Sequence, residues 1–518
     1  MQVLKVGVAK SDITPPVGTK MDGYIRRKDV SQGIQDPLFA KALYLNDGHA
    51  QAALVVIDSL AVGQKLVRKA RKQIEQETGL PTQHVSIAAT HTHSGPSGLL
   101  VLSFGEGYDD DLLEFVASQI TKAVKQAKEG AFEAILKVGS TVVEGITQDR
   151  RNPAQPIDQR LHVLSIEDTA GRLRAVLANY PCHPTFLGFD NLMISADWPG
   201  AVCSIIEKVV NDDVIVIMTN GASGDIHPMY LRQSVEDMKR MGQVLGGSIV
   251  TLLGHLRPVG KRLRTQNVRW SIEVETEPPY GRLVTDPRVQ VFHRSVSLPA
   301  KEFVSEGEHD KEIKELGDEL MTLGLDDDTL SLLTANPGSV AQTKVSLAST
   351  QLAHSEDIST LPAPSDKTLH SIENNLAVSP ERDISLALAQ LRRKYDLLAR
   401  LNRLAGERLE RDGPIRKSGE RQEQEIDLYL MSFDPDLAVL LIPGELSGRI
   451  GLSIKQRSGV RNLIIVTYAN NYAGYIVPAE EYPKGGYEVG VSHFGAEAEV
   501  ILTQAALDLI GEATSYAK

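Results

Sequence analysis

The chain has 518 residues, of which 42% are hydrophobic and 24% are charged, and its formal net charge is -12. This length and apolar content allow a large buried core, whereas the acidic balance and the absence of a basic stripe argue against a nucleic-acid partner, because such binding depends on neutralising phosphates. With only two cysteines, Cys182 and Cys203, the chain cannot carry a disulfide framework, and a reducing compartment is favoured.

The N-terminal segment MQVLKVGVAKSDITPP lacks the basic region followed by an apolar stretch that marks a secretion signal. No run in the sequence reaches the roughly 18 apolar residues that a membrane-spanning helix needs. We therefore expect a cytoplasmic protein without stable membrane insertion.

Short apolar, β-branched runs alternate with helical patterns up to about residue 260, and this alternation returns after about residue 425. The alternation is typical of the α/β class. It predicts a mixed sheet core flanked by helices, with a first part of the α/β catalytic domain at residues 1–275, a long helical insertion at 276–424 and a second α/β part at 425–518.

Six of the apolar runs end in a Gly, Pro or Asn turn that carries His, Asp, Glu or Tyr. They are QAALVVIDSL, HVSIAATHTHSGP, LRAVLANYPCHPT, VIVIMTNGASGDIHP, LAVLLIPGEL and NLIIVTYANNYAGY. Binding sites in open α/β sheets form at the carboxyl ends of strands. We therefore expect these turns to meet in one site.

Between about Pro278 and Gln424 the strand patterns thin out and charged residues become frequent. Within this segment, a 4-3-4-3 spacing of apolar residues predicts a long amphipathic helix. Its stripe consists of Ile384, Leu388, Leu391, Tyr395 and Leu398. The stripe either covers the α/β body or forms a coiled-coil contact in a homo-oligomer, and the spacing does not distinguish the two.

The histidines of ATHTHSGP, His91 and His93, follow an apolar run. On an extended segment, residues i and i+2 share a face, which suits a metal, or one ligand with a supporting histidine. The same pair can instead close a strand through local hydrogen bonds.

Further candidates are His183 in NYPCHPT, Glu445 in LIPGEL and the tyrosines of TYANNYAGY. Two imidazoles, a carboxylate and optionally a phenolate suit zinc, with a position left for water or substrate. Singly, each residue could instead cap a loop or helix, or pack in the core.

The motifs ATHTHSGP, N-x-x-x-H-P-T, G-x-x-G-D-x-x-P, PGE, and N-x-Y-x-G-Y followed by P-A-E-E-Y-x-x-x-x-Y-E occur in this order. Over residues 3–275 and 425–490 the chain thereby resembles the neutral/alkaline non-lysosomal ceramidase family, in particular its shorter bacterial members, without the C-terminal β-sandwich domain. The resemblance implies a zinc ion held by His91, His183, Glu445 and Tyr475, with His93 nearby in support.

One position departs from the family. The family pattern G-D-x-S-P-N has a serine proposed as nucleophile, whereas this chain reads GDIHPM and places His227 there. A histidine cannot form the same acyl-enzyme, although it can act as a general base or bind an anion. We therefore expect weak or no ceramide hydrolysis. The site arginine of the family would match Arg150 or Arg151, and Tyr487 of the tyrosine signature joins the candidate catalytic residues.

The expected mechanism is attack by a zinc-activated water, whose pKa would fall to about 7. His227 or His93 would shuttle the proton, and Asp225 and Asp197 would either orient a histidine or cap helices.

The sequence thus predicts a zinc-dependent hydrolase of an amide or other acyl bond in a small-molecule substrate. Two alternatives remain open. One is a zinc hydrolase of a polar or carbohydrate-derived metabolite; the other is a non-catalytic assembly protein with a structural metal.

Overall fold

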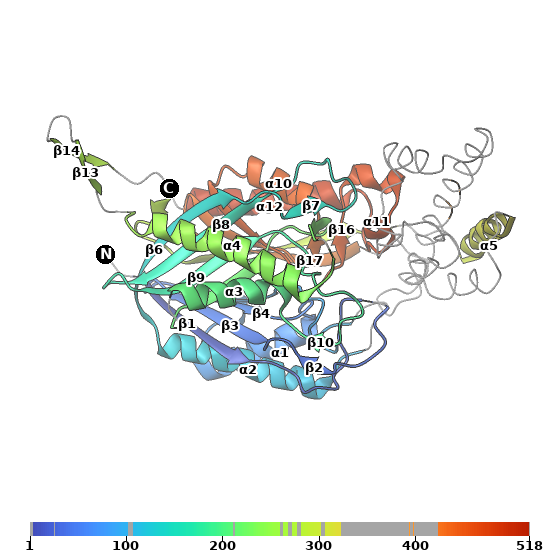
Figure 1. The fold of residues 1–518 in the computed structure, drawn as a ribbon, viewed down its shortest axis with the longest axis horizontal. Helices are drawn as coiled ribbons and strands as arrows, with labels where there is room; N and C mark the ends of the chain where they lie inside the picture. Colours follow the sequence, from blue (N-terminus) through green and yellow to red (C-terminus); the bar gives the residue numbers. More distant parts are fainter. Residues whose placement is uncertain are drawn as a thin grey trace.

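The computed structural model describes most of the chain outside the segment between residues 323 and 422. The described residues are 4–24, 26–101, 107–210, 213–230, 232–259, 263–267, 272–276, 281–301, 306–322, 393, 397 and 423–516. They form two stacked β-sheets enclosed by helices (Figure 1).

The larger sheet has nine strands, in the order β11-β9-β8-β6-β1-β3-β4-β5, with β15 paired to β6. Its strands are β1 (Lys5–Asp12), β3 (Phe39–Asn46), β4 (Gln51–Ile57), β5 (Val85–Ala89), β6 (Phe132–Val142), β8 (Arg160–Asp168), β9 (Leu173–Tyr180), β11 (Ile215–Asn220) and β15 (Arg282–Leu283). The β4–β5 and β9–β11 pairs are parallel and the other pairs are antiparallel. The sheet is therefore mixed, as the sequence predicts.

The smaller sheet has the order β16-β17-β18-β20. Its strands are β16 (Gln290–Pro299), β17 (Glu423–Asp434), β18 (Leu437–Leu441) and β20 (Asn462–Val466). The β18–β20 pair is parallel. One apolar cluster joins side chains of both sheets, for example Leu54 and Val56 from β4 with Val439 and Ile464 from β18 and β20. The two sheets therefore pack face to face.

The described helices are α1 (Gln64–Thr78), α2 (Asp110–Glu129), α3 (Asp197–Val210), α4 (Val235–Leu256), α5 (Glu306–Thr322), α10 (Gly448–Arg457), α11 (Tyr487–Gly490), α12 (Ala498–Tyr516) and the 3-10 helices η1 (Thr82–His84) and η4 (Ala479–Lys484). Six of them, α1 to α4, α10 and α12, cover the outer faces of the two sheets. Helices α1 and α2 pack on the β1, β3, β4 and β5 half of the larger sheet, and α3 and α4 on the β8, β9 and β11 half. Helices α10 and α12 cover the smaller sheet on the opposite side of the molecule (Figure 1).

This four-layer arrangement explains why the strand sequences are apolar at consecutive positions. In β4, Ala53, Val55 and Ile57 face the helices α1 and α2, whereas Ala52, Leu54 and Val56 face the second sheet. Successive side chains of a strand point to opposite faces. A strand that is buried on both faces therefore needs an apolar residue at nearly every position.

Four short two-stranded pairs complete the described structure. They are β2 (Gly33–Ile34) with β10 (Met193–Ile194), β7 (Thr147–Asp149) with β12 (Ile226–Pro228), β13 (Leu263–Asn267) with β14 (Ile272–Thr276), and β19 (Glu445–Leu446) with β21 (Tyr475–Ile476). The β19–β21 pair sets Glu445 opposite Tyr475, and the β7–β12 pair sets His227 opposite Gln148. Two of these pairs thus carry candidate site residues.

The predicted α/β class is confirmed. Strands β15 and β16, which lie inside the expected insertion at 276–424, pair with β6 and β17 of the α/β body. The apolar stripe from Ile384 to Leu398 lies outside the described residues. Both interpretations of the stripe, an oligomer contact and a cover over the α/β body, therefore stay predictions. Among the helices that the structure describes, none combines the length and the apolar character required to cross a membrane.

Candidate active site

The six apolar runs singled out in the sequence are the strands β4, β5, β9, β11, β18 and β20. They form three parallel pairs, β4 with β5, β9 with β11, and β18 with β20. Because parallel neighbours end at the same edge of a sheet, the loops that follow them meet there. His91, His183 and Glu445 come from three of these loops.

Asn220, the last residue of β11, ties two of the loops together. Its side-chain amide donates to the carbonyl oxygens of Thr90 and Cys182, at 3.3 and 2.9 Å. These are the residues directly before His91 and His183, so one buried amide fixes the main chain that carries both histidines. Sequence analysis did not single out Asn220; its only signal is the Asn-Gly pair at a strand end.

The histidine pair differs from the extended geometry that the sequence suggested. Strand β5 ends at Ala89, and His91 has a left-handed backbone with φ of +70°. The rings of His91 and His93 nevertheless meet edge to face at 4.9 Å, and their Nε2 atoms lie 3.3 Å apart. The two imidazoles therefore converge through a strained turn and not through strand alternation.

The orientation of His91 and His183 is fixed by main-chain acceptors. His91 Nδ1 lies 2.7 Å from the carbonyl oxygen of Leu60, and His183 Nδ1 lies 2.6 Å from that of Ser223. Since a carbonyl only accepts, each Nδ1 carries the proton, and each Nε2 presents a lone pair. Metal-ligating histidines are held in this way. Both side chains are almost fully buried, at 1% and 0% exposure.

Glu445 lies opposite these two lone pairs. Its Oε2 atom is 3.2 Å from His183 Nε2 and 3.5 Å from His91 Nε2. Gly444, with φ of +114°, brings the chain so close to Gly474 that a Cβ would lie 2.5 Å from the Gly474 carbonyl oxygen. Only glycine fits before Glu445, because any side chain there would clash with the neighbouring loop.

The electrostatics of the cluster favour an ionised Glu445 beside a neutral His183. Burial tends to raise the pKa of Glu445, but His91 and His183 outweigh it and hold this pKa well below its usual range. Burial lowers the pKa of His183 to about 4. His91, His93 and His183 offer ring nitrogens that lie within 4.8 Å of one another, so the group can hold a metal ion.

Three tyrosines surround the cluster in different roles. The Tyr472 hydroxyl donates to Glu445 Oε1 at 2.6 Å. The Tyr468 ring stacks on His91 at 3.8 Å between centroids. Tyr475, the tyrosine that the family resemblance nominates as a ligand, accepts a hydrogen bond from Arg150 Nη2 at 3.3 Å. Its role as a metal ligand stays a prediction.

The two candidate arginines occupy different positions. Arg150 lies beside the rings of Tyr475 and Tyr487, 5.8 and 5.7 Å from their centroids, and its Nε donates to Glu488 Oε1 at 2.6 Å. Arg151 points away to Glu488 Oε2 and Glu481 Oε2, at 2.7 and 3.0 Å. Of the two candidates, Arg150 is therefore the one in contact with Tyr475, and its role in the site stays a prediction.

His227 lies in β12 and its Nε2 is 3.0 Å from the Thr185 hydroxyl. Burial lowers its pKa well below the usual value, and Arg150 and His183 lower it further. Thr185 follows His183 by two residues, so its contact with His227 brings the ring near the loop that carries His183. The imidazole is neutral near pH 7, and its lowered pKa makes it a weaker proton acceptor than an exposed histidine.

Asp225 and Asp197 bind main-chain N–H groups. Asp225 Oδ1 accepts from the Gly448 N–H at 2.7 Å, at the start of α10, and its other oxygen accepts from the Ser447 hydroxyl. Asp197 accepts from Trp198 N at 2.6 Å and from Leu187 N at 3.1 Å. Of the two roles that the sequence left open, these contacts match capping and loop bracing.

Sequence analysis missed the residues that hold His93. Arg27 Nη1 donates to the His93 carbonyl oxygen at 2.7 Å, and the Tyr24 ring lies 4.9 Å from the His93 ring. Gly23 has φ of +107°, and a Cβ there would lie 2.6 Å from the Cβ of His93. The signal in the sequence is weak: a glycine followed by an aromatic and basic residues in MDGYIRR.

Fold and site together define an α/β protein with a buried cluster of histidines and a carboxylate that can hold a metal ion. Residues 4–243 match the family model for neutral/alkaline non-lysosomal ceramidase, N-terminal. The relationship to neutral ceramidases that the motifs predicted is therefore confirmed.

Two curated relatives illustrate the extent of the likeness. The neutral ceramidase of Drosophila melanogaster is 28% identical over 228 residues, which are 40% of this chain and 32% of that protein. The neutral ceramidase of Pseudomonas aeruginosa is 27% identical over 222 residues, which are 38% of this chain and 32% of that protein. The match thus spans about a third of the length of these relatives.

Solved structures extend the likeness in fold over the whole chain. The crystal structure of the Pseudomonas aeruginosa neutral ceramidase covers 100% of this chain and 75% of its own, with a TM-score of 0.63 and 17% identity. A ceramidase complexed with C2 gives a TM-score of 0.64 at 17% identity, with 100% and 76% covered. At this identity the comparison shows the fold alone.

Proposed function

We propose that this protein is a zinc-dependent hydrolase that cleaves an amide or other acyl bond of a small-molecule substrate. The contact between His183 Nε2 and Glu445 Oε2 carries the proposal. The two atoms lie 3.2 Å apart, both are buried, and neither has a hydrogen-bond partner among the described residues. A nitrogen lone pair that faces a carboxylate oxygen is repelled unless a cation balances the pair, and a metal ion with both atoms as ligands would do so.

The donor set fits zinc. His91 and His183 would bind through Nε2 and Glu445 through its carboxylate, and the family resemblance adds Tyr475. Imidazole nitrogen and carboxylate oxygen are ligands that zinc takes in catalytic sites. When bound, zinc supplies Lewis acidity, which polarises a carbonyl group and makes water more acidic.

Residues of the chain itself would bind the substrate and move the proton. His227 is the residue to which we assign the transfer of a proton from the attacking water to the leaving group. The Arg150 guanidinium, buried beside Tyr475, can stabilise negative charge that develops on the substrate oxygen. Tyr472 holds Glu445 in place and so acts as a positioning residue.

We further propose that long-chain ceramide is a poor substrate. The relatives are named neutral ceramidases, but this chain has His227 where the family pattern has a serine. The neutral His227 and the Arg150 guanidinium would present a polar lining to the substrate. These two side chains favour, as a second candidate, a polar or carbohydrate-derived acyl compound over a long lipid.

The test is a substrate screen of the purified, zinc-loaded chain against N-acyl, ester and glycoside libraries, with ceramide included. We expect turnover of a polar acyl compound that disappears on chelation and in His183→Ala. Robust ceramide turnover would overturn the substrate proposal.

Hydrolysis that persists unchanged in chelated protein and in His183→Ala would refute the metal dependence. Stoichiometric zinc without turnover of any compound would instead support the alternative of a structural metal in an assembly protein.

A further inference from the structure

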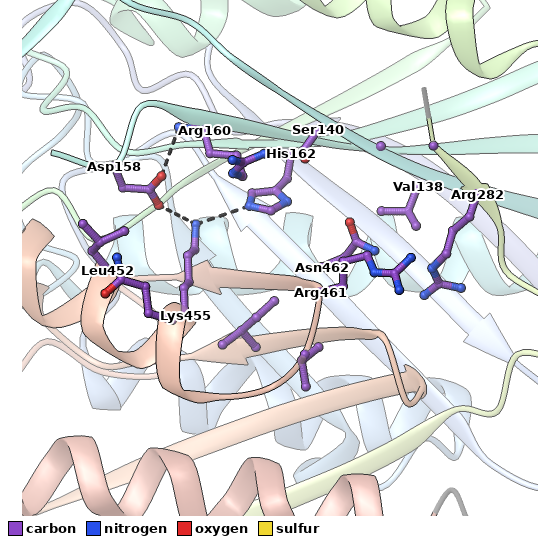
Figure 2. A pocket seen from close by; sticks show the side chains of 15 residues that line it. Val138, Ser140, Asp158, Arg160, His162, Arg282, Leu452, Lys455, Arg461 and Asn462 are labelled. Atoms are coloured by element: carbon purple, nitrogen blue, oxygen red, sulfur yellow. Dashed lines mark hydrogen bonds and ion pairs between the residues drawn. The ribbon is translucent and has the colours of Figure 1, made fainter. Parts of the chain in front are cut away.

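A cavity of about 660 Å³ lies between the larger sheet and the C-terminal half of α10 (Figure 2). Strands β6 and β8 form one wall, and α10 with the start of β20 forms the other. None of the active-site residues described above lines it. Its volume is in the range of small-molecule binding sites.

The cavity is electropositive although the protein is acidic. Its lining includes the cations Arg160, Arg282, Lys455 and Arg461, but only one carboxylate, that of Asp158. The whole chain has a net charge of -12. A local excess of cations in such a chain concentrates positive potential in the hollow.

The single carboxylate is already engaged. Asp158 Oδ2 accepts from Lys455 Nζ at 2.7 Å, and its Oδ1 accepts from the Arg160 main-chain N–H at 3.0 Å. Figure 2 shows Lys455 reaching from α10 to a place between Asp158 and His162. Asp158 therefore balances the charge of Lys455. Its described contact with Arg160 is to the main chain and not to the guanidinium.

The three arginines of the lining differ in how far nearby carboxylates balance their charge. Arg282 forms two hydrogen bonds with Asp434, at 2.6 and 2.7 Å, so this carboxylate balances its charge. Arg461 is 74% exposed and reaches Asp436 only at 4.0 Å. The described contact of the Arg160 guanidinium is with a neutral group, the Ser140 hydroxyl, at 3.2 Å. Arg160 and Arg461 are therefore the two cations of the lining whose charge is least balanced by a nearby carboxylate.

His162 adds an unsatisfied donor to the same wall. It is 2% exposed, and its Nε2 lies 3.4 Å from the ammonium of Lys455. Because an ammonium only donates, Nε2 must accept and the proton must sit on Nδ1. This buried Nδ1 has no hydrogen-bond partner among the described residues. Burial, together with the nearby cations Lys455 and Arg160, lowers the pKa of His162 well below its usual value, so the ring is neutral.

We propose that this cavity binds a small, multiply charged oxyanion, with Arg160 as its principal contact and Arg461 at its rim. Guanidinium groups from separate elements suit an anion with several oxygens. The hydroxyl of Ser140 and the amides of Gln456 and Asn462, which also line the cavity, add neutral donors. Phosphate and dicarboxylate groups share this chemistry.

The test is calorimetric titration of the full-length chain at low salt, with inorganic phosphate in one arm and succinate in the other. Thermal unfolding in each anion gives a second readout. We expect saturable binding, a rise in Tm and loss of affinity as sodium chloride is added. Tighter binding of phosphate identifies a phosphate ligand, and tighter binding of succinate a carboxylate ligand.

Substitutions of the arginines in the lining test whether the anion binds in this cavity. Arg160→Gln should lower the affinity for the preferred anion by about tenfold or more, because it removes a charge-assisted hydrogen bond. Arg461→Gln should lower this affinity less. The matched control Arg68→Gln removes an exposed arginine of α1 and should change nothing.

Three outcomes would overturn the proposal. They are no binding of either anion at millimolar concentration, unchanged affinity in Arg160→Gln, and an equal loss of affinity in Arg68→Gln. Unchanged affinity in Arg160→Gln would mean that the anion binds elsewhere, for example at the metal site.

Discussion

His183 Nε2 and Glu445 Oε2 lie 3.2 Å apart in the interior, and neither atom has another hydrogen-bond partner among the described residues. The Nδ1 proton of His183 is committed to the Ser223 carbonyl oxygen, so a nitrogen lone pair faces a carboxylate oxygen. Such an arrangement is repulsive unless a cation balances it. This contact between the histidine and the carboxylate is therefore the main structural support for a bound cation.

The first prediction concerns metal content. His91→Ala and His183→Ala should each abolish stoichiometric zinc, because each removes an Nε2 donor from a site of few ligands. Elemental analysis of purified protein measures this directly. His49→Ala, at an exposed histidine, is the matched control and should keep its zinc. Full zinc in both site variants would rule out the assigned ligands.

The second prediction separates two tyrosines. Tyr472→Phe removes the hydrogen bond to Glu445 Oε1 and should lower zinc affinity by about 10- to 100-fold, the usual effect of losing such a supporting contact. Tyr475→Phe should lower the affinity at least as much if Tyr475 is a ligand. Zinc competition with a chromophoric chelator measures both. If Tyr475→Phe binds zinc with wild-type affinity, Tyr475 is not a ligand, and its described role is its hydrogen bond with Arg150.

The third prediction concerns His227. If it shuttles the proton, His227→Asn should lower kcat by about 100-fold or more on the substrate found by screening, with zinc content intact. If it binds an anionic group, the same change should mainly raise KM. Thr185→Val, which removes the partner of His227 Nε2, should shift the pH profile in the same assay. Wild-type kcat and KM in His227→Asn would exclude His227 from the reaction.

The fourth prediction is a pH dependence of stability. Burial raises the pKa of Asp197 to about 7, whereas an unfolded aspartate titrates near 4. Between these values the unfolded chain loses the proton and the folded chain keeps it. This group therefore lowers the free energy of unfolding as pH rises from about 4 to about 7, by at most about 1.4 kcal/mol per pH unit.

Asp197→Asn does not titrate, so its stability relative to wild type should improve steadily across that range. Urea unfolding at several pH values measures the difference. The exposed Asp29→Asn variant should track the wild type. A constant difference between Asp197→Asn and wild type would show that Asp197 is ionised throughout.

Much of this protein can be predicted from local sequence. The six strands and the turns after them follow from runs of apolar, β-branched residues bounded by Gly, Pro and Asn, and the structure contains all six. His91, His183 and Glu445 were found because each follows such a run, and strand ends are where α/β sites form. These inferences need only neighbours along the chain.

Tertiary structure alone decided the rest. An apolar run shows that a strand is buried on both faces, but not whether a helix or a second sheet covers each face, so the stacking of the two sheets was not foreseen. Likewise, which tyrosine reaches Glu445, which arginine faces the site and how Asn220 braces two histidine loops depend on contacts between distant segments. The sequence determined which side chains stand at strand ends; only packing in three dimensions decided which of them touch, because side-chain contacts across sheets and loops leave no periodic signal in the chain.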